Sequence, residues 1–489
     1  MSQTASPRIK RSLRPTTSAP PQAKRAVVSG TFGSALEWFD FAVYGAMSAT
    51  VFPALFFNEM DPAMGILASF ATFGVGFFAR PLGGIVFGHL GDRIGRRKVL
   101  LSTFISMGVA SLIIGLLPPY SAIGLAAPLL LVVMRFIQGF ALGGEATGAQ
   151  LMTMEHAPED RRAFYGALMA MGSPVSQVAA NLLLAVLSGV LSDAAFLSWG
   201  WRVPFLLSIA LVAVGIYIRL KVEETPVYQE GMKELAQETT SPAVVIRTHW
   251  ATMLRLILAF SPIVLTFYIV SVFGISYLTT HGFTRSQTFT IIMISNFLSV
   301  IAIWWGGRLA DVYGRRKILM VGSIGTLVAA VMFFAVVDLG SFPLTLGMVA
   351  FALVTAQFGN AGQGALFAEA FPTHMRYTGS ALALTGANLI FAAPAPFIAS
   401  WLTGLSGGST ITITIFWVVT IAAAIVNMLL MGDGRTLEGG THRFGRYLTA
   451  EETRAEDARA GGATARGTVP QAGATVPGAS PTVPAGVTR

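Results

Sequence analysis

Two acidic side chains and a tyrosine lie on one stripe of an otherwise apolar stretch near the N-terminus. In the run LEWFDFAVYG (36–45), Glu37, Asp40 and Tyr44 are spaced i, i+3 and i+7, which on a helix keeps them within about 60° of circumference. A charged side chain at the centre of a lipid-spanning helix costs roughly 2.5–3.5 kcal/mol. We therefore expect this stripe to face the protein interior, where a carboxylate can take up and release a proton.

A second apolar stretch carries a cation on a similar stripe. Arg135, Gln138, Leu142 and Glu145 follow at i, i+3, i+7 and i+10. Arginine keeps its proton at any usable pH, so a carboxylate must be the titrating partner. Because isolated charges in lipid are costly, we expect Asp40 and Arg135 to face inward and to pair, either in proton coupling or in a static ion pair that fixes packing. For Glu37 both interpretations stay open.

An anionic substrate would need a buried cation, and Arg80 and Arg135 are the cations that lie away from the ends of the apolar runs. A guanidinium binds a carboxylate through two parallel hydrogen bonds. Arg135, nearer the midplane, is the better candidate, and protonation of Asp40 would free it for the anion. Further candidate ligands, each alternatively a hydrogen bond between helices, are Tyr44, Gln138, Gln177, Asn181, Tyr268, Asn360, Gln363 and Asn388.

The elements that position these residues are predicted to be membrane-spanning helices. The chain of 489 residues is 53% hydrophobic and 12% charged, about half the charge of a soluble domain. A helix needs about 20 apolar residues to cross a bilayer. Twelve such runs are present: 29–57, 63–88, 99–117, 124–152, 163–191, 203–220, 254–278, 287–307, 318–337, 343–371, 379–403 and 409–431.

The positive charges are distributed as in a membrane protein rather than a nucleic-acid binder. Of the 33 Lys and Arg residues, two, Arg80 and Arg135, lie well inside spans, and two, Arg202 and Arg285, lie in outer loops. The other 29, which include Arg219 and Arg255 at the inner ends of their spans, lie on the other side. This positive-inside asymmetry predicts a multi-pass protein of the cell (inner) membrane with both termini in the cytoplasm. The chain has no cysteine. It shows no metal-ligand cluster, phosphate-binding loop or placed nucleophile, so we expect neither an enzyme nor a cofactor beyond the coupling proton.

Two segments recur along the chain and indicate an internal duplication. GHLGDRIGRRKVLL (88–101) and GRLADVYGRRKILM (307–320) match at eight of fourteen positions, with Asp92 and Asp311 219 residues apart. Glu155 and Arg162 recur as Glu369 and Arg376, 214 residues apart. The predicted organisation is a parallel repeat, divided into a disordered N-terminal tail (1–25), a six-helix half (26–220), a cytoplasmic linker (221–253), a second six-helix half (254–431) and a mostly disordered C-terminal tail (432–489).

These motifs resemble the major facilitator superfamily. GHLGDRIGRRK with its second copy and RFIQG (135–139) are similar to signatures of that superfamily. EWFDFAVYG, FFARPLGG, RFIQGFALGGE, WGWRVPF, EETPVY and AEAFPTHMRYTG together resemble its metabolite:proton symporter family, from about residue 29 to 431. The resemblance implies an all-helical fold of twelve spans, alternating access between two halves, and proton-coupled uptake of small metabolites, many of them organic acids, with zwitterionic osmolytes in a branch that carries a C-terminal coiled coil. It also implies that Asp40 of the first span and Arg135 of the fourth cooperate in proton transfer, which favours coupling over a static ion pair.

The loop motif is predicted to gate the transporter rather than to bind substrate. Gly91 and Gly95 would permit a tight turn, and Asp92 would accept hydrogen bonds from the N-terminus of a neighbouring helix, where the backbone dipole favours an anion. Arg96, Arg97 and Lys98 would hold lipid headgroups or Glu155. The alternative is that the basic triplet only sets the topology, which we prefer for Lys98 and Lys317. For Glu145 we prefer a structural pair with Arg80. The full gating set is Gly91, Asp92, Gly95, Arg96, Arg97, Glu145, Glu155, Arg162, Glu224, Asp311, Gly314, Arg315, Arg316, Glu369 and Arg376.

Three functions remain after this reasoning. We favour a monomeric symporter in the lipid bilayer that takes up a small carboxylate. An efflux antiporter or an uncoupled facilitator is the alternative, although GSPVSQV (172–178) lacks the paired glycines of the antiporter signature. A membrane sensor is disfavoured because the Ala-, Gly-, Thr- and Pro-rich tail offers no signalling domain.

Overall fold

The protein folds into a bundle of long helices. The computed structural model describes residues 35, 38–94, 96–143, 161–222, 241–431, 442–443 and 446–447. The first span is helical over residues 38–50. The elements that follow in the first half are α2 (Phe52–Phe56), α3 (Pro62–Ile94), α4 (Arg96–Leu116), α5 (Tyr120–Ile123), α6 (Ala126–Leu142), α8 (Arg162–Ala170), α9 (Gly172–Val190), α10 (Asp193–Ser198), the short 3-10 turn η2 (Gly200–Arg202) and α11 (Val203–Val222).

The second half contains longer and more interrupted helices. Its elements are α13 (Pro242–Tyr268), the π-helical turn η3 (Ile269–Phe273), α14 (Gly274–Thr280), α15 (Arg285–Tyr313), α16 (Arg315–Val337), α17 (Phe342–Asn360), α18 (Gln363–Glu369), α19 (Thr373–Ala387), the π-helical turn η4 (Asn388–Ala392), α20 (Ala395–Leu405) and α21 (Ile411–Leu430). A two-residue strand pair follows, β1 (His442–Arg443) and β2 (Arg446–Tyr447), antiparallel with His442 opposite Tyr447. The sequence did not predict these strands.

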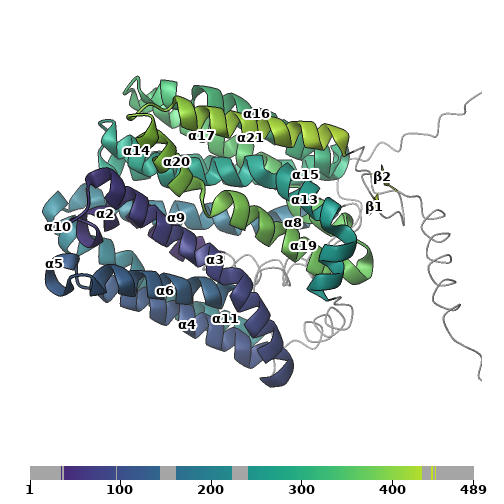
Figure 1. Cartoon of the computed structure of the whole chain (residues 1–489), viewed down its shortest axis with the longest axis horizontal. Helices are drawn as coiled ribbons and strands as arrows, with labels where there is room; N and C mark the ends of the chain where they lie inside the picture. The colour runs from purple at the N-terminus through teal and green to yellow at the C-terminus, as the bar shows by residue number, and fades with distance from the viewer. Residues whose placement is uncertain are drawn as a thin grey trace, which may run out of the picture.

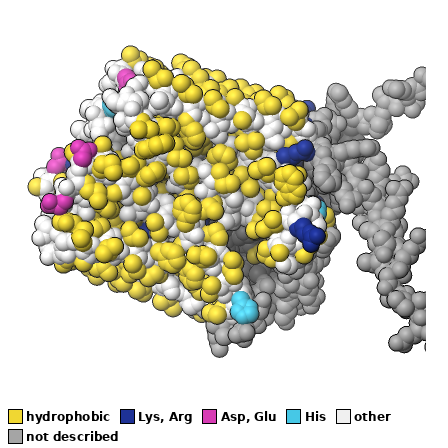
Figure 2. All heavy atoms as spheres, viewed as in Figure 1, with side chains coloured by type: hydrophobic (Ala, Val, Ile, Leu, Met, Phe, Trp, Pro, Cys, Tyr) yellow, Lys and Arg dark blue, Asp and Glu magenta, His cyan; other side chains and the backbone are white. Residues whose placement is uncertain are grey.

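The helices have the length and composition of membrane spans. Within the described residues, eight are long and apolar enough to cross a bilayer, and three shorter apolar helices lie at 101–116, 126–142 and 200–214. With the helix at 38–50, each of the twelve predicted runs therefore falls on a helical segment. Large apolar side chains such as Phe297, Val331 and Leu429 are exposed, and Figure 2 shows hydrophobic side chains over most of the visible face. A lipid environment explains this surface, because soluble monomers rarely expose large apolar patches.

The helices fall into two groups that follow chain order. Helices α3, α4, α6 and α11 lie together, whereas α13, α15, α16, α17 and α21 form the other group, with α9 packed against α15 (Figure 1). We call the end of the bundle that carries Glu59, Asp61, Asp193 and Asp338 the acidic end. The opposite end, with Arg161, Arg162, Arg315, Arg316 and Lys317, is the basic end. In Figure 2 the visible acidic side chains gather at one end and most of the visible Lys and Arg at the other.

Two glycine contacts bring α3 and α6 together at backbone distance. A Cβ on Gly139 would lie 1.9 Å from the carbonyl oxygen of Gly76, and one on Gly83 would lie 1.8 Å from that of Phe140. Small residues drive helix association in membranes because they allow this approach. The contact fixes Arg135, on α6, against α3.

The structure corrects three details of the sequence prediction. Gly91 lies inside α3 and forms no turn, which agrees with Ala310, a strong helix former, at the same position of the second copy. Residues 242–248, within the predicted linker, are helical, with Pro242 in the first turn because proline suits that position; a kink at His249 separates them from the rest of α13. The π-helical turns η3 and η4 interrupt two predicted spans.

Candidate functional site

Asp40 is buried and held by two serine hydroxyls. The Oγ atoms of Ser111, on α4, and Ser208, on α11, donate to its two carboxylate oxygens, each at 2.5 Å. Asp40 itself is only 3% exposed. Hydrogen bonds to a carboxylate are stronger than those between neutral groups. Through these bonds α4 and α11 are both held to the first span at Asp40.

Arg135 is fully buried and lies against aromatic rings. Its guanidinium carbon lies 4.0 Å from the ring centre of Phe41 and 4.1 Å from that of Tyr44. Such cation–π contacts stabilise a desolvated cation by about 2 kcal/mol. The Nη1 atom donates to Gln138 Oε1 at 3.2 Å, whereas Nε and Nη2 have no hydrogen-bond partner among the described residues. These two nitrogens form one side of the guanidinium, the side that can bind a carboxylate through two hydrogen bonds.

The structure does not contain the direct Asp40–Arg135 ion pair that the sequence predicted. The two residues are instead joined by a chain of hydrogen bonds in which Arg135 donates to Gln138, Gln138 Nε2 donates to Ser111 Oγ at 2.7 Å, and Ser111 donates to Asp40. The helix stripes correctly bring both charges into one site. The short serine side chain and the amide fill the space between them.

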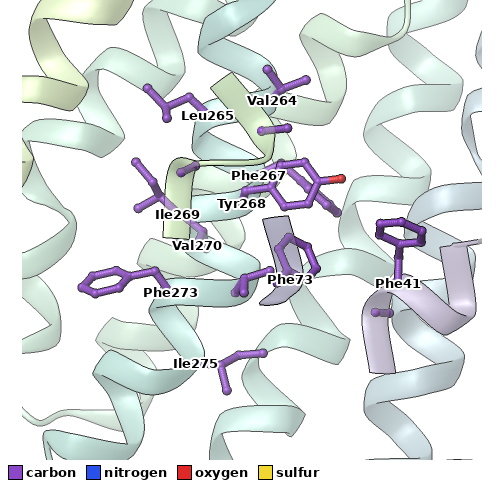
Figure 3. Packing of buried hydrophobic residues seen from close by; sticks show 14 of the residues in the cluster. Phe41, Phe73, Val264, Leu265, Phe267, Tyr268, Ile269, Val270, Phe273 and Ile275 are labelled. Atoms are coloured by element: carbon purple, nitrogen blue, oxygen red, sulfur yellow. The ribbon is translucent and has the colours of Figure 1, made fainter. Parts of the chain in front are cut away.

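Tyr268 brings the second half of the chain to this site. Its ring centre lies 5.9 Å from that of Phe73 and 5.5 Å from that of Phe77, and Figure 3 shows Phe73 beside Tyr268, with Phe41 on the neighbouring span. The Tyr268 hydroxyl is buried without a hydrogen-bond partner among the described residues. It lies within electrostatic range of both Arg80 and Arg135.

The other predicted ligands of the first half are divided between this site and local packing. Arg80 joins the site, with its guanidinium carbon 4.3 Å from the ring centre of Phe41. The Tyr44 hydroxyl donates to Thr72 Oγ1 at 2.8 Å. Asn181 donates to the backbone and side-chain oxygens of Gln177 within α9; both residues are buried.

Three candidates of the second half lie at breaks in helices. Gln363 is buried at the start of α18, and Asn360, the last residue of α17, donates to the Gln357 amide oxygen at 2.8 Å. Asn388 begins η4 and donates to the Leu384 carbonyl. π-Helical turns are frequent at functional sites, and Tyr268 immediately precedes the other one.

The gating motif of the second copy forms a compact cluster at the basic end. The Asp311 carboxylate accepts hydrogen bonds from the backbone N–H groups of Ala163 (3.0 Å) and Phe164 (2.9 Å), in the first turn of α8. Arg315 lies 3.5 Å from Asp311 and 3.1 Å from Glu369. The motif predicts both features: the contact of the aspartate with a helix N-terminus, and the pair of a basic and an acidic side chain. The contact between Asp311 and α8 joins the two halves of the chain.

Three further members of the gating set are described near this cluster. Arg376 donates to the Ala368 carbonyl, and Arg316 donates to that of Leu429 at 3.3 Å. Arg162 begins α8.

Several predicted residues cannot be placed. Glu37, Gly95, Glu145, Glu155 and Glu224 lie outside the described residues, as do the side chains of Asp92, Arg96 and Arg97. Within the described part of the chain, no cluster of three or more His, Cys, Asp or Glu residues could hold a metal ion.

The sequence did not identify Ser111 and Ser208, the direct partners of Asp40. Both are single hydroxyls in apolar runs that contain other serines, such as Ser102 and Ser106 in the same predicted span as Ser111. Only the packing of α4 and α11 against the first span distinguishes them. A search for small polar residues on a buried helix face would have found these two serines, but it would not have distinguished them from the other serines of the same spans.

Comparison with known proteins identifies relatives over most of the chain. Residues 30–393 match the family described as the Major Facilitator Superfamily. The chain is 37% identical over 387 residues to the inner membrane metabolite transport protein YhjE of Escherichia coli (strain K12), covering 77% of this chain and 87% of that protein. It is 36% identical over 418 residues to the shikimate transporter of the same strain, covering 85% and 95% respectively.

Two further comparisons broaden this group. The proline/betaine transporter of Escherichia coli (strain K12) is 32% identical over 437 residues, covering 86% of this chain and 85% of that protein. Among solved structures, a D-xylose–proton symporter superposes with a TM-score of 0.65 at 15% identity, covering 87% of this chain and 99% of that one. At that identity the superposition supports the fold alone.

Proposed function

Since the chain belongs to the Major Facilitator Superfamily, as a secondary transporter of its metabolite:proton symporter family, we propose that it takes up a small organic acid anion together with protons. The observation that carries this proposal is the hydrogen-bonded chain from Asp40 to Arg135. It joins a buried carboxylate, which can titrate, to a buried cation, which cannot. Proton binding and anion binding thus share one network.

Arg135 is the proposed anion site. Its Nε and Nη2 atoms are buried donors without partners among the described residues, and a buried donor left unpaired costs about 1–3 kcal/mol, more when it is charged. A substrate carboxylate would accept from both, and the Tyr268 hydroxyl is a third donor from the other half. The similarity to a shikimate transporter supports a carboxylate. The similarity to proline/betaine transporters makes a zwitterion the second candidate.

We assign the basic end to the cytoplasm, since Lys and Arg are enriched in cytoplasmic loops. In this orientation the Asp311–Arg315–Glu369 cluster closes the cytoplasmic side by holding the first turn of α8 against α15. Opening toward the cytoplasm requires that these contacts break. The protein is proposed to work as a monomer, because one chain supplies every residue of the site.

Uptake into proteoliposomes tests this function. Purified protein is reconstituted, an inwardly directed proton gradient is imposed, and accumulation of a panel of labelled organic acids and zwitterions is measured with and without a protonophore. We expect a carboxylate to accumulate and the protonophore to abolish its accumulation. Equilibration of the substrate without accumulation would identify a facilitator. Expulsion of preloaded substrate by the inward proton gradient would identify an antiporter.

Replacing Asp40 separates coupling from binding. Asp40→Asn keeps the shape, and can accept from one serine and donate to the other, but cannot titrate, so we predict loss of proton-driven accumulation with retained substrate exchange. Both are measured in the same vesicles. A D40N variant that still concentrates substrate would remove Asp40 from the coupling mechanism.

A further inference from the structure

Among the described residues, Ser111 occupies the one position through which Asp40 and Arg135 are linked by hydrogen bonds. Its hydroxyl donates to Asp40 Oδ2 at 2.5 Å, accepts from Gln138 Nε2 at 2.7 Å, and lies 3.0 Å from the Met107 carbonyl oxygen, a second acceptor. Ser208 donates to the other oxygen of the same carboxylate, and its other contact is the Pro204 carbonyl. The two serines thus hold Asp40 equally, but only Ser111 continues toward Arg135.

We propose that Ser111 is a positioning residue that transmits the protonation of Asp40, through Gln138, to the anion-binding side chain of Arg135. This inference rests on the proposed function and specifies how proton and substrate are coupled. It replaces direct competition for Arg135 by an indirect connection. Ser111 itself contacts neither the substrate nor the guanidinium.

The direction of the effect follows from hydrogen-bond polarisation. With Asp40 ionised, the Ser111 hydroxyl donates to a charge, which makes its oxygen a better acceptor for Gln138, and the Gln138 oxygen in turn a better acceptor for Arg135 Nη1. When a proton from the aqueous phase binds Asp40, the carboxylic acid donates to Ser111 and the serine hydrogen turns to the Met107 carbonyl. The chain weakens, the Arg135 charge is less compensated at Nη1, and the anion binds more tightly at Nε and Nη2.

Among the described residues, two cations act on this switch. Arg135 of α6 acts electrostatically on Asp40, and Arg80 of α3 acts on Arg135, whereas α4 and α11 present Ser111 and Ser208 to the carboxylate. Arg80 stays charged at any usable pH, so it adds no titration of its own. Glu37, one turn earlier on the same span, lies outside the described residues. A pH dependence of anion affinity that disappears without the Ser111 hydroxyl therefore reports transmission from Asp40.

The test compares two one-atom deletions at the same carboxylate. Ser111→Ala and Ser208→Ala each remove one hydrogen bond to Asp40, and Ser323→Ala removes a buried hydroxyl on α16 that donates only to the Leu319 carbonyl. In proteoliposomes we measure proton-driven accumulation, exchange without a gradient, and the KM of exchange from acid to neutral pH. The substrate is the transported acid that the panel identifies. It is used within the pH range in which it stays ionised, so that any change of KM with pH comes from a group of the protein.

We expect KM to fall with falling pH in wild type and S323A, and to fall over a shifted pH range in S208A, which loses one hydrogen bond to Asp40 but keeps the link through Ser111. In S111A the KM should become independent of pH and accumulation should fall about ten-fold or more, in line with the loss of a charge-assisted hydrogen bond, while exchange continues. Ser111→Thr, which retains the hydroxyl, should restore the pH dependence. If S111A does not fold, Ser111→Cys, with its weaker donor, is measured in its place.

The outcomes separate this inference from the proposed function. A wild type that accumulates no acid under a proton gradient overturns both. A coupled wild type whose S111A variant keeps the same pH dependence and accumulation overturns the role of Ser111 alone. Equal losses in S111A and S208A would show that both serines merely hold Asp40, and would likewise reject transmission through Ser111.

Discussion

Arg135 is fully buried, and each of its neighbours compensates its charge in a different way. Phe41 and Tyr44 offer ring faces, and Gln138 accepts one hydrogen bond. Gly76, on α3, contributes by its lack of a side chain, because a Cβ there would lie 2.8 Å from Arg135 Nε and 3.1 Å from Cζ. The space that this glycine leaves decides where the Nε edge of the guanidinium lies.

Gly76→Ala is therefore predicted to displace Arg135. The added methyl group forces the guanidinium away from α3 and misaligns the Nε–Nη2 edge, so we expect substrate affinity to fall about ten-fold or more. Stability should change little, since alanine favours a helix interior by about 0.5–1 kcal/mol over glycine and this gain offsets the strain. Substrate binding and thermal unfolding are measured on the same preparation.

Gly74→Ala is the matched control on the same helix. Its Cβ would lie 3.2 Å from the Ala393 carbonyl oxygen, without contact to Arg135, so affinity should be retained. Wild-type affinity in G76A would show that Arg135 does not hold the substrate through this edge.

Helix periodicity in the sequence predicts which charged residues line the site, but not which residues contact them. Spacing places Asp40 and Arg135 on buried faces because charge is excluded from lipid, and this holds for any arrangement of the helices. The partners that hold Asp40 come from α4 and α11, 71 and 168 residues away. Which hydroxyl of an apolar helix meets the acid depends on the rotation of that helix, which hydrophobicity alone does not determine.

At the scale of elements, the junction between α15 and α16 depends on one glycine. Gly314 has φ +100°, and its N–H donates to the Ala310 carbonyl to end α15. The basic triplet that starts α16 follows immediately. Residues that carry a Cβ atom rarely adopt this backbone conformation, so the turn that places Arg315 beside Asp311 requires glycine.

Gly314→Ala should lower the stability of the folded protein by about 1–2 kcal/mol. We expect a lower thermal unfolding midpoint in detergent and weakened closure at the basic end. Gly347→Ala on α17 is the control, since its Cβ meets nothing within 4 Å and its φ is ordinary. That variant should match or slightly exceed the wild-type midpoint. Equal midpoints for all three proteins would contradict the requirement for glycine.

Helix interruptions mark the limit of prediction at this scale. The positions of the spans follow from runs of about 20 apolar residues, and the structure places a helical segment on every one. The π-helical turns at 269–273 and 388–392 leave no comparable signal, because they depend on how neighbouring helices satisfy the backbone. Residues such as Tyr268 and Asn388, at the start of these turns, could be predicted only as polar residues of a span.

At the scale of the whole molecule, the halves touch at both ends of α15, which packs against α8 at the basic end and against α9 at the acidic end. At the basic end Asp311 binds the first turn of α8. At the acidic end Arg285 forms an ion pair with Asp193, and Ser286 Oγ donates to the Ala185 carbonyl at 3.1 Å. The duplicated motif predicted the first contact, whereas the second lies outside both copies and follows only from the packing of the halves. Alternating access requires these two ends to open in turn.

A pair of cysteines at the acidic end can test this requirement directly. A Cβ on Gly189, in the last turn of α9, would lie 3.8 Å from the Cβ of Ser286 on α15, which matches the Cβ separation of about 3.8 Å in disulfides. The chain has no cysteine of its own, so Gly189→Cys with Ser286→Cys introduces the only thiols. We predict that oxidation joins the halves at this end and abolishes uptake, and that a reductant restores it.

Each single variant, oxidised in the same way, serves as the control and should transport as before. Fragment mobility after proteolysis within the 223–240 segment reports whether the bond has formed. Because the acidic end is assigned to the outside, the bond should also block access of an added substrate to Arg135 from that side while leaving access from the basic end. Full uptake with a confirmed disulfide would mean that the halves do not separate along α9 and α15, and that the pathway opens elsewhere.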